Sequence, residues 1–216
     1  MFISFEGLDF SGKSTQARRL TNRLRNPAVT HEKGPCVHFL REPGGTLISE
    51  RIRDVLLDKA NVALTDVAEL LLFSASRAQL VAEVIRPALT RGEAIVCDRF
   101  VDSTTAYQGY GRGIPADVVR AINAAATGGT MPGLTVFIDI PVDEIGRRKM
   151  RAGQVFDRME SSGAAFYERV RTGFHEIAAA EPGRFLTIDG LKTVEEIESS
   201  IWSAVGRQFG VPISQG

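Results

Sequence analysis

Cysteine, long apolar runs and unbalanced charge are all scarce in this sequence. The 216 residues include two cysteines, Cys36 and Cys97, each within a short apolar stretch, which favours buried reduced thiols over a disulfide framework. No apolar run reaches the roughly 18 residues of a membrane-spanning helix, and no basic and apolar leader precedes the first expected strand. We therefore expect a cytoplasmic protein without a membrane partner.

Positive and negative residues are equal in number, with 26 lysines and arginines against 26 aspartates and glutamates. A neutral chain has no overall field to attract nucleic acid, so we expect no such partner. Internal repeats and low-complexity segments are also missing, and 44% hydrophobic residues suffice for one large core. This composition favours a single domain over residues 1–210, followed by a frayed tail at 211–216.

The most informative segment that is present is Gly7–Ser14, which matches the pattern G-x-x-x-x-G-K-[ST] at every fixed position. A strand-like run at 2–6 precedes it, and a helical pattern with Leu20 and Leu24 on one face follows at 15–24. This order of strand, glycine loop and helix is the context that a phosphate-binding P-loop requires. A glycine-rich turn beside a solvated lysine is the alternative.

A P-loop assigns a role to each of its fixed residues. Gly7 and Gly12 allow backbone angles that a Cβ resists, and the helix N-terminus attracts phosphate. Lys13 would reach the β- and γ-phosphates, while Ser14 would hold Mg²⁺ through its hydroxyl. The predicted ATP-binding residues are Gly7, Leu8, Asp9, Phe10, Ser11, Gly12, Lys13, Ser14 and Thr15.

Strands alternate with helices along the remaining chain, which predicts an α/β fold with a parallel sheet covered on both faces. The expected strands are 2–6, 36–40, 93–100, 134–140 and 184–188. Helices are expected at 15–24, 46–58, 65–92 with a break at Pro87, 116–126, from Pro141 onward, 162–180 and 193–209, and a loop at 25–35. The helix at 46–58 would place Ile48, Ile52, Val55 and Leu56 on one face, and the helix at 65–92 would bury Val67, Leu71, Ala78, Val81 and Ile85.

Chemistry-bearing residues follow several of these strands. Asp98 and Arg99 end an apolar strand, where a carboxylate suits Mg²⁺ and an arginine suits a phosphate. Phe73 and Arg77 lie four apart on a helix, so they suit a flat heterocycle and its carbonyl, although a core phenylalanine beside a surface arginine is the alternative. The segment 102–109 is too polar for a core helix and favours a solvated loop.

A cationic run lies between residues 147 and 158, with five basic residues against one acidic residue. Its arginines are Arg147, Arg148, Arg151 and Arg158. A solvated face is one interpretation of such a run, and a lid over nucleotide phosphates at about 147–160 is the other.

Taken together, these motifs resemble the thymidylate kinases, and specifically the bacterial type. The resemblance lies in Phe5–Asp9, Gly12–Thr15, Arg41–Thr46, Phe73 with Arg77, Asp98–Phe100 with Ser103, Ala106–Gly109 and Phe156–Glu160. It implies a three-layer P-loop kinase fold with a five-stranded parallel sheet and a short lid, usually as a homodimer. It also implies transfer of the γ-phosphate of ATP to dTMP, with Mg²⁺ as cofactor.

The resemblance further implies a role for each matching residue. Asp9 would bind the deoxyribose 3′-hydroxyl, Phe73 would stack on thymine, Arg77 would donate to its O4, and Tyr107 would crowd C2′. Arg99 and Arg41 would hold the acceptor phosphate, Thr104 would lie near the base edge, Asp98 would help to place Mg²⁺, and Pro43 is a candidate for a cis peptide. The full predicted substrate set is Asp9, Arg41, Pro43, Phe73, Arg77, Arg99, Ser103, Thr104, Tyr107 and Gln108, and the predicted catalytic set is Lys13, Arg99, Arg151 and Asp9.

One position departs from part of that family. Phe10 stands where the eukaryotic type carries an arginine, so the lid is expected to supply the missing cation, with Arg151 as the favoured residue.

Three alternatives remain: a kinase for dUMP or a cytidylate, a regulatory P-loop switch, and a DNA-bound ATPase. The absence of an Asn-Lys-x-Asp motif and the phosphate site implied by Asp98 and Arg99 disfavour the switch, and the zero net charge disfavours the DNA-bound ATPase.

Overall fold

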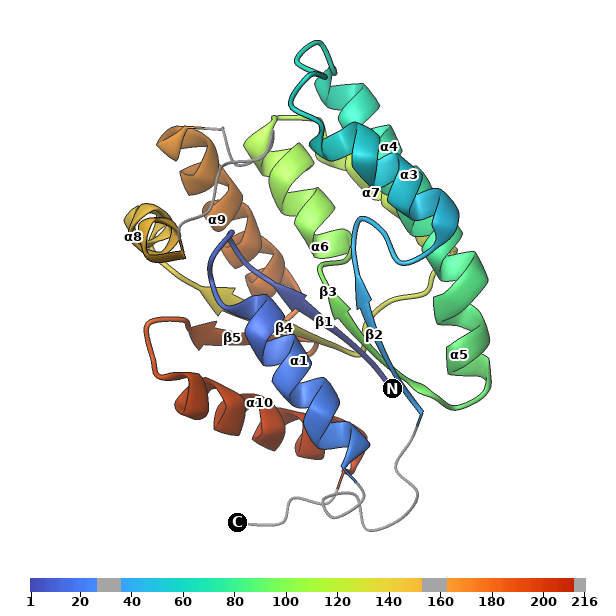
Figure 1. Ribbon diagram of the computed structural model, residues 1–216, viewed down its shortest axis with the longest axis vertical. Helices are drawn as coiled ribbons and strands as arrows, with labels where there is room; N and C mark the ends of the chain where they lie inside the picture. Colours follow the sequence, from blue (N-terminus) through green and yellow to red (C-terminus); the bar gives the residue numbers. More distant parts are fainter. Residues whose placement is uncertain (27–35, 153–162, 212–216) are drawn as a thin grey trace.

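The computed structural model describes residues 1–26, 36–152 and 163–211. Most of the expected loop at 25–35, the end of the expected lid including Arg158, and the tail from residue 212 lie outside the described residues. Within them, five strands form one parallel sheet in the order β2-β3-β1-β4-β5 (Figure 1), which confirms the predicted fold class. No helix of the described residues is long and apolar enough to cross a membrane.

The strands agree closely with the hydrophobic runs of the sequence. They are β1 (Phe2–Glu6), β2 (Val37–Arg41), β3 (Ala94–Asp98), β4 (Leu134–Asp139) and β5 (Phe185–Asp189). Both β1 and β3 are buried along their whole length, because helices cover both faces of the sheet at its centre. β3 ends two residues earlier than expected, and Arg99, the next residue, has a φ of 72° that turns the chain away from the sheet.

The helical segments also follow the predicted order. They are α1 (Lys13–Arg25), α3 (Leu47–Leu57), α4 (Asp66–Leu80), η1 (Val81–Ile85), α5 (Arg86–Thr90), α6 (Val101–Thr104), η2 (Thr105–Gly111), α7 (Ala116–Thr127), α8 (Val142–Ala152), α9 (Ala164–Ala180) and α10 (Val194–Phe209). Both η1 and η2 are π-helical. The π-helical turn η1 ends two residues before Pro87, which lies in the first turn of α5, so the expected break at this proline does not occur and the helix is irregular only in the turn before it.

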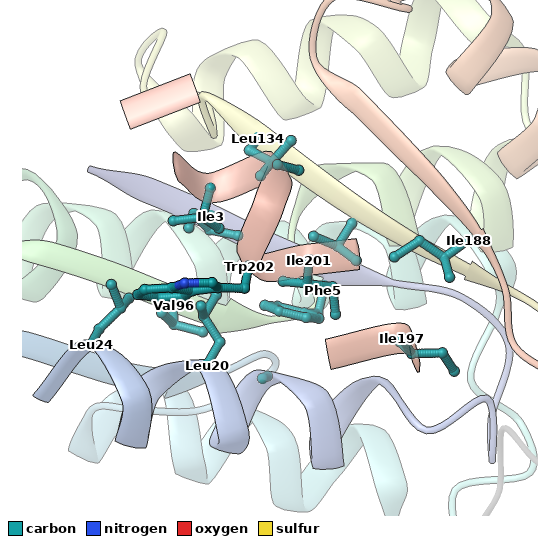
Figure 2. Close-up of a cluster of buried hydrophobic side chains, with 14 of the residues drawn as sticks. Ile3, Phe5, Leu20, Leu24, Val96, Leu134, Ile188, Ile197, Ile201 and Trp202 are labelled. Atoms are coloured by element: carbon teal, nitrogen blue, oxygen red, sulfur yellow. The ribbon is translucent and has the colours of Figure 1, made fainter. Parts of the chain in front are cut away.

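Helices α1 and α10 cover one face of the sheet (Figure 1). Their apolar side chains meet those of the central strands in one buried cluster, in which the Trp202 ring lies among Leu20, Leu24 and Val96 (Figure 2). Because α1 also carries the end of the P-loop, this cluster fixes the position of that loop relative to the sheet.

Two further apolar clusters lie on the opposite face. One joins Phe137 of β4 to Phe174 of α9 and Tyr107 of η2. The other joins Ile95 and Cys97 of β3 to α4, η1 and α5. The sheet therefore has helices on both faces, as a three-layer fold requires.

The predicted burial of α3 and α4 is wrong in part. Val67 and Leu71 are 54% and 51% exposed, and Ile48 and Val55 are 49% and 45% exposed. On α4, Leu70 and Leu80 are buried instead. The sequence places leucine at 70, 71 and 72, so apolar residues occur on more than one face of α4 and periodicity does not select the buried one.

Two other expectations are also corrected. Cys36 is exposed, because it precedes the edge strand β2, whereas Cys97 is buried in β3 as expected. The polar segment at 102–109 is helical and largely buried. Its polar groups find partners in distant elements: Asp102 accepts from Arg184 at 2.7 Å, and Gln108 donates to Glu69 at 3.0 Å. Buried polar side chains are tolerated when they are hydrogen-bonded in this way.

Candidate active site

A cavity of about 250 Å³ opens at the carboxyl ends of the central strands, which is where open α/β sheets place their ligands. All ten residues of the predicted substrate set line it, together with Lys13, Ser14 and Asp98. Glu42, Arg53 and Leu57 also line the cavity and were not predicted. The structure thus brings the predicted residues together around one space, while their individual roles stay predictions.

The P-loop has the backbone geometry that its glycines predict. Gly7 and Gly12 have φ angles of 140° and 96°, and a Cβ at Gly7 would overlap the carbonyl oxygen of Ile138. The Nζ atom of Lys13 donates to the carbonyl of Leu8 at 3.2 Å and lies 3.8 Å from Asp9. Burial lowers the pKa of Lys13. A phosphate in this loop would replace the carbonyl of Leu8 as the partner of this ammonium group.

Arg99 connects the P-loop to η2 and α6. Its guanidinium donates to Asp9 at 2.6 Å, to Ser103 at 2.9 Å and to Tyr107 at 3.2 Å. Burial raises the pKa of Asp9, but the charges of Arg99 and Lys13 outweigh this effect and lower the pKa overall, so Asp9 is ionised. The result is a carboxylate and a cation held rigidly at the cavity wall.

Glu6, for which no role was predicted, supports this arrangement through the residues that follow Arg99. Its carboxylate accepts from the amide of Phe100 at 2.7 Å and from the hydroxyl of Ser103 at 2.5 Å. Burial, with a contribution from the charge of Asp102, raises the pKa of Glu6 to about 8. Its place as the last residue of β1, next to Gly7, was the available signal.

Arg77 is almost fully buried at the far wall of the cavity, which excludes the alternative of a surface arginine. It donates to Glu42 at 2.7 Å, to Asn123 at 3.1 Å and to the carbonyl of Phe100 at 3.1 Å. Burial raises the pKa of Glu42. Sequence reasoning missed Glu42 and Asn123 as partners of Arg77. They belong to the loop after β2 and to α7, both far from α4 in sequence. The peptide before Pro43 is cis, as the resemblance implied.

Asp98 fits a cation site. Its Oδ1 atom is buried and accepts no hydrogen bond from the part of the chain that the structure describes. Ser14 lines the same cavity. A carboxylate oxygen and a hydroxyl are the hard oxygen ligands that Mg²⁺ prefers.

The arginines of α8 occupy different environments. Arg148 donates to the carbonyls of Phe10 and Ser11 at 3.2 Å each and to that of Gly190 at 2.7 Å, so it braces the P-loop. Arg147 pairs with Asp143 at 2.7 Å and is 61% exposed. Arg151 is exposed near the end of α8. At the second strand, Arg41 donates to both carboxylate oxygens of Glu50 at 3.0 Å.

A glycine loop between a strand and a helix, a buried lysine and an adjacent cavity with buried cations define a P-loop phosphotransferase. The family model described as thymidylate kinase matches residues 5–201. The chain therefore belongs to the thymidylate kinase family.

Individual relatives agree with this assignment. The thymidylate kinase of Deinococcus radiodurans is 48% identical over 96% of this chain and 97% of its own length, and that of Trichlorobacter lovleyi is 44% identical over 99% of this chain and 100% of its own length. The crystal structure of thymidylate kinase from Ehrlichia chaffeensis superposes with a TM-score of 0.75 at 33% identity, covering 95% of this chain and 97% of that one.

Proposed function

We propose that this protein transfers the γ-phosphate of ATP to dTMP, giving ADP and dTDP. The observation that carries the proposal is that one cavity is shared by the P-loop residues Lys13 and Ser14 and by the ten residues of the predicted substrate set. The donor and acceptor phosphates would therefore meet beside Arg99, Asp9 and Asp98. Membership of the thymidylate kinase family supports dTMP as the acceptor.

The acceptor would lie between Phe73 and the Arg77 network. Phe73 would stack on the base, and Arg77, held by Glu42 and Asn123, would donate one of its remaining N–H groups to the thymine carbonyl. Tyr107, fixed by hydrogen bonds to Arg99 and Asp9, would crowd the 2′ position of a ribose. Pre-positioned side chains of this kind reduce the ordering cost of binding.

Phosphoryl transfer depends almost entirely on position and charge. Lys13 and Arg99 would stabilise the charge on the phosphoryl oxygens, and Asp9 would hold Arg99 and the deoxyribose hydroxyl in place. Mg²⁺, held by Ser14 and Asp98, would supply charge neutralisation at the phosphates when bound. Arg151 would add a further cation from the lid, which fits the absence of an arginine at Phe10.

The decisive experiment measures ADP release from ATP with a panel of nucleoside monophosphates. We expect turnover with dTMP to exceed turnover with dUMP, CMP and dCMP. Activity on a different monophosphate alone would reassign the enzyme within the nucleotide kinases, and silence with all of them would support the regulatory switch. Lys13→Ala should lower turnover with dTMP at least about a hundredfold without unfolding the protein.

The lid proposal needs a matched pair of variants. Arg151→Ala should lower turnover with little change in the KM for ATP, because a lid acts mainly in the transition state. Arg147→Ala is the matched control, since Arg147 is already paired with Asp143 and Glu144. Equal and full activity of both variants would show that this run is a solvated face. Phe10→Arg should partly restore the Arg151→Ala enzyme.

A homodimer is part of the same proposal. Leu47, Ile48 and Val55 on α3 and Val67 and Leu71 on α4 are 45% to 71% exposed, and α3 packs against α4. Large exposed apolar patches on proteins often mark interaction sites. A cytoplasmic dimer would bury these side chains of α3 and α4. Sedimentation analysis at micromolar concentration should give twice the monomer mass.

A further inference from the structure

Three metal-binding side chains lie together at the opposite end of the sheet from the cavity. Cys36 immediately precedes β2, His38 lies within β2, and Glu93 immediately precedes β3. The Sγ, imidazole nitrogen and carboxylate oxygen of these residues all lie within 4.8 Å of one another. They sit at the amino ends of the strands, whereas the substrate cavity lies at the carboxyl ends, so they form a separate group.

The pairing of β2 with β3 holds the three side chains on one face. Residues two apart on a strand share a face, so Cys36 and His38 do, while Val37 between them packs into the cluster on the other face. His38 pairs with Ile95, and the amide of Ala94 donates to the carbonyl of Cys36 at 2.9 Å. This register places Glu93 beside Cys36, so the backbone of two hydrogen-bonded strands positions all three ligands.

The distances between the ligand atoms fit a small tetrahedral ion. The Nε2 atom of His38 lies 3.7 Å from the Sγ of Cys36 and 2.7 Å from the Oε2 of Glu93. A tetrahedral Zn²⁺ ion with its usual bond lengths separates nitrogen from sulfur by about 3.6 Å and nitrogen from oxygen by about 3.4 Å. The first separation is already present. The second needs the Glu93 carboxylate, whose side chain is 19% exposed, to move outward by a fraction of an ångström.

Arg91 orients the third ligand. It donates to both carboxylate oxygens of Glu93 at 2.8 Å. An outer partner of this kind fixes the direction of a ligating carboxylate, although the positive charge of Arg91 reduces the affinity for a cation. Since Arg91 is 56% exposed, water screens much of that repulsion.

We propose that Cys36, His38 and Glu93 form a Zn²⁺ site that ties the edge strand β2 to β3. A set of one sulfur, one nitrogen and one oxygen ligand selects Zn²⁺ over the hard cation Mg²⁺. Three protein ligands leave the fourth position open to water or to another ligand. Because the thiol must lose its proton on binding, the ion would neutralise a thiolate and a carboxylate together.

The first experiment uses the wild-type chain, so it does not depend on any variant folding. Co²⁺, a spectroscopic substitute for Zn²⁺, should produce thiolate charge-transfer absorption at one equivalent per chain. One equivalent of Zn²⁺ should remove that absorption and slow the alkylation of Cys36 at least about tenfold, as mass spectrometry would show. The absence of both the absorption and the protection would overturn the proposal.

The second experiment assigns the ligands by chelator competition with Zn²⁺ alone. Cys36→Ser, His38→Gln and Glu93→Gln should each weaken binding at least about tenfold, because each removes a direct ligand. His175→Gln is the matched control: His175 also contacts a carboxylate, Asp139 at 3.1 Å, without a cysteine beside it, and its loss should change nothing. Thermal melting checks that each variant is folded. Unchanged zinc affinity in Cys36→Ser would place the ion elsewhere, for example at Asp98, and would also refute the site.

Discussion

Helices α4 and α10 distribute their apolar residues differently. α10 buries Ile197, Ile201 and Trp202 against the sheet and leaves polar residues outside, as an amphipathic helix does. α4 buries the charged residues Glu69 and Arg77 beside Leu70 and Leu80, and it exposes Val67 and Leu71. The difference follows from what each helix faces: α10 covers the sheet, whereas α4 lines a polar cavity on one side and carries exposed apolar residues on the other. This mixed burial is what the proposed substrate site and the proposed dimer surface would require of α4.

The largest expected effect comes from Arg77 on the buried face of α4. Arg77→Ala leaves Glu42 buried without its cation, so we expect a loss of roughly 3–5 kcal/mol in the free energy of unfolding. The KM for dTMP should rise far more than the KM for ATP, because Arg77 is proposed to bind the thymine base. Chemical denaturation and steady-state kinetics measure the two effects.

The double variant Glu42→Gln with Arg77→Met separates the effect on stability from the effect on dTMP binding. Removing both charges should recover much of the stability, since no unpaired charge is left buried, while dTMP binding stays weak. Recovery of dTMP binding together with stability would mean that Arg77 has only a structural role.

The corresponding change in α10 should affect stability alone. Ile201→Ala opens a cavity in the cluster beneath α10 and should cost roughly 2–5 kcal/mol in the free energy of unfolding. Turnover per folded molecule should stay at the wild-type value, because no residue of α10 lines the substrate cavity. Val194→Ala, at a 40% exposed position of the same helix, is the control and should cost less than about 0.5 kcal/mol. A fall in turnover per folded Ile201→Ala molecule would contradict the division between the two helices.

The exposed face of α4 should control association. Leu71→Glu places a charge in the proposed dimer surface twice, once from each subunit, and should weaken dimerisation at least about tenfold. The same charge at Val194→Glu on α10 should leave the dimer intact. Sedimentation velocity over a concentration series compares the two, and an unchanged Leu71→Glu dimer would remove α4 from the interface.

The smallest effect concerns the residues that cap the N-termini of α10 and α4. The Thr193 hydroxyl oxygen accepts from the Glu196 amide at 3.2 Å, and the Glu196 carboxylate accepts from the Thr193 amide at 2.9 Å, which completes a capping box. At the start of α4, Thr65 accepts from Ala68 at 3.4 Å without a return bond. Thr193→Ala should therefore lower stability by about 1 kcal/mol, and Thr65→Ala by less. Thermal unfolding of the two variants compares their losses of stability. A larger loss for Thr65→Ala than for Thr193→Ala would contradict the prediction.

These two helices also show what the sequence can predict. The expected helix at 193–209 agrees with α10 and its N-cap Thr193, because one apolar stripe and a local cap define this helix. The buried face of α4 was wrong because Leu70 and Leu71 are equally apolar, and only the position of the cavity and of α7 separates them. Local patterns predict an element, whereas the neighbours of that element decide which face is buried.

The residues of the candidate site also divide into those that the sequence predicts and those that it does not. Motif spacing identified Lys13, Asp98 and Arg99, because their chemistry is tied to the ends of strands. It did not predict Glu6 as the partner of Ser103, or Asn123 as the partner of Arg77, since these pairs are 97 and 46 residues apart. The same reason explains the error at 102–109, where polar side chains are buried with partners from distant strands and helices.

The position of β1 at the centre of the sheet has a consequence for how the chain is made. Phe2 pairs with Ile95 and Ile3 with Leu134, so β1 leaves the ribosome before either of the strands with which it pairs. At about 5 to 20 residues per second, the chain between Phe2 and Ile95 takes roughly 5 to 20 s to synthesise. Throughout that time the apolar run before Gly7 has no sheet to enter. Protection of this nascent segment from aggregation is therefore a requirement that the strand order imposes on the cell.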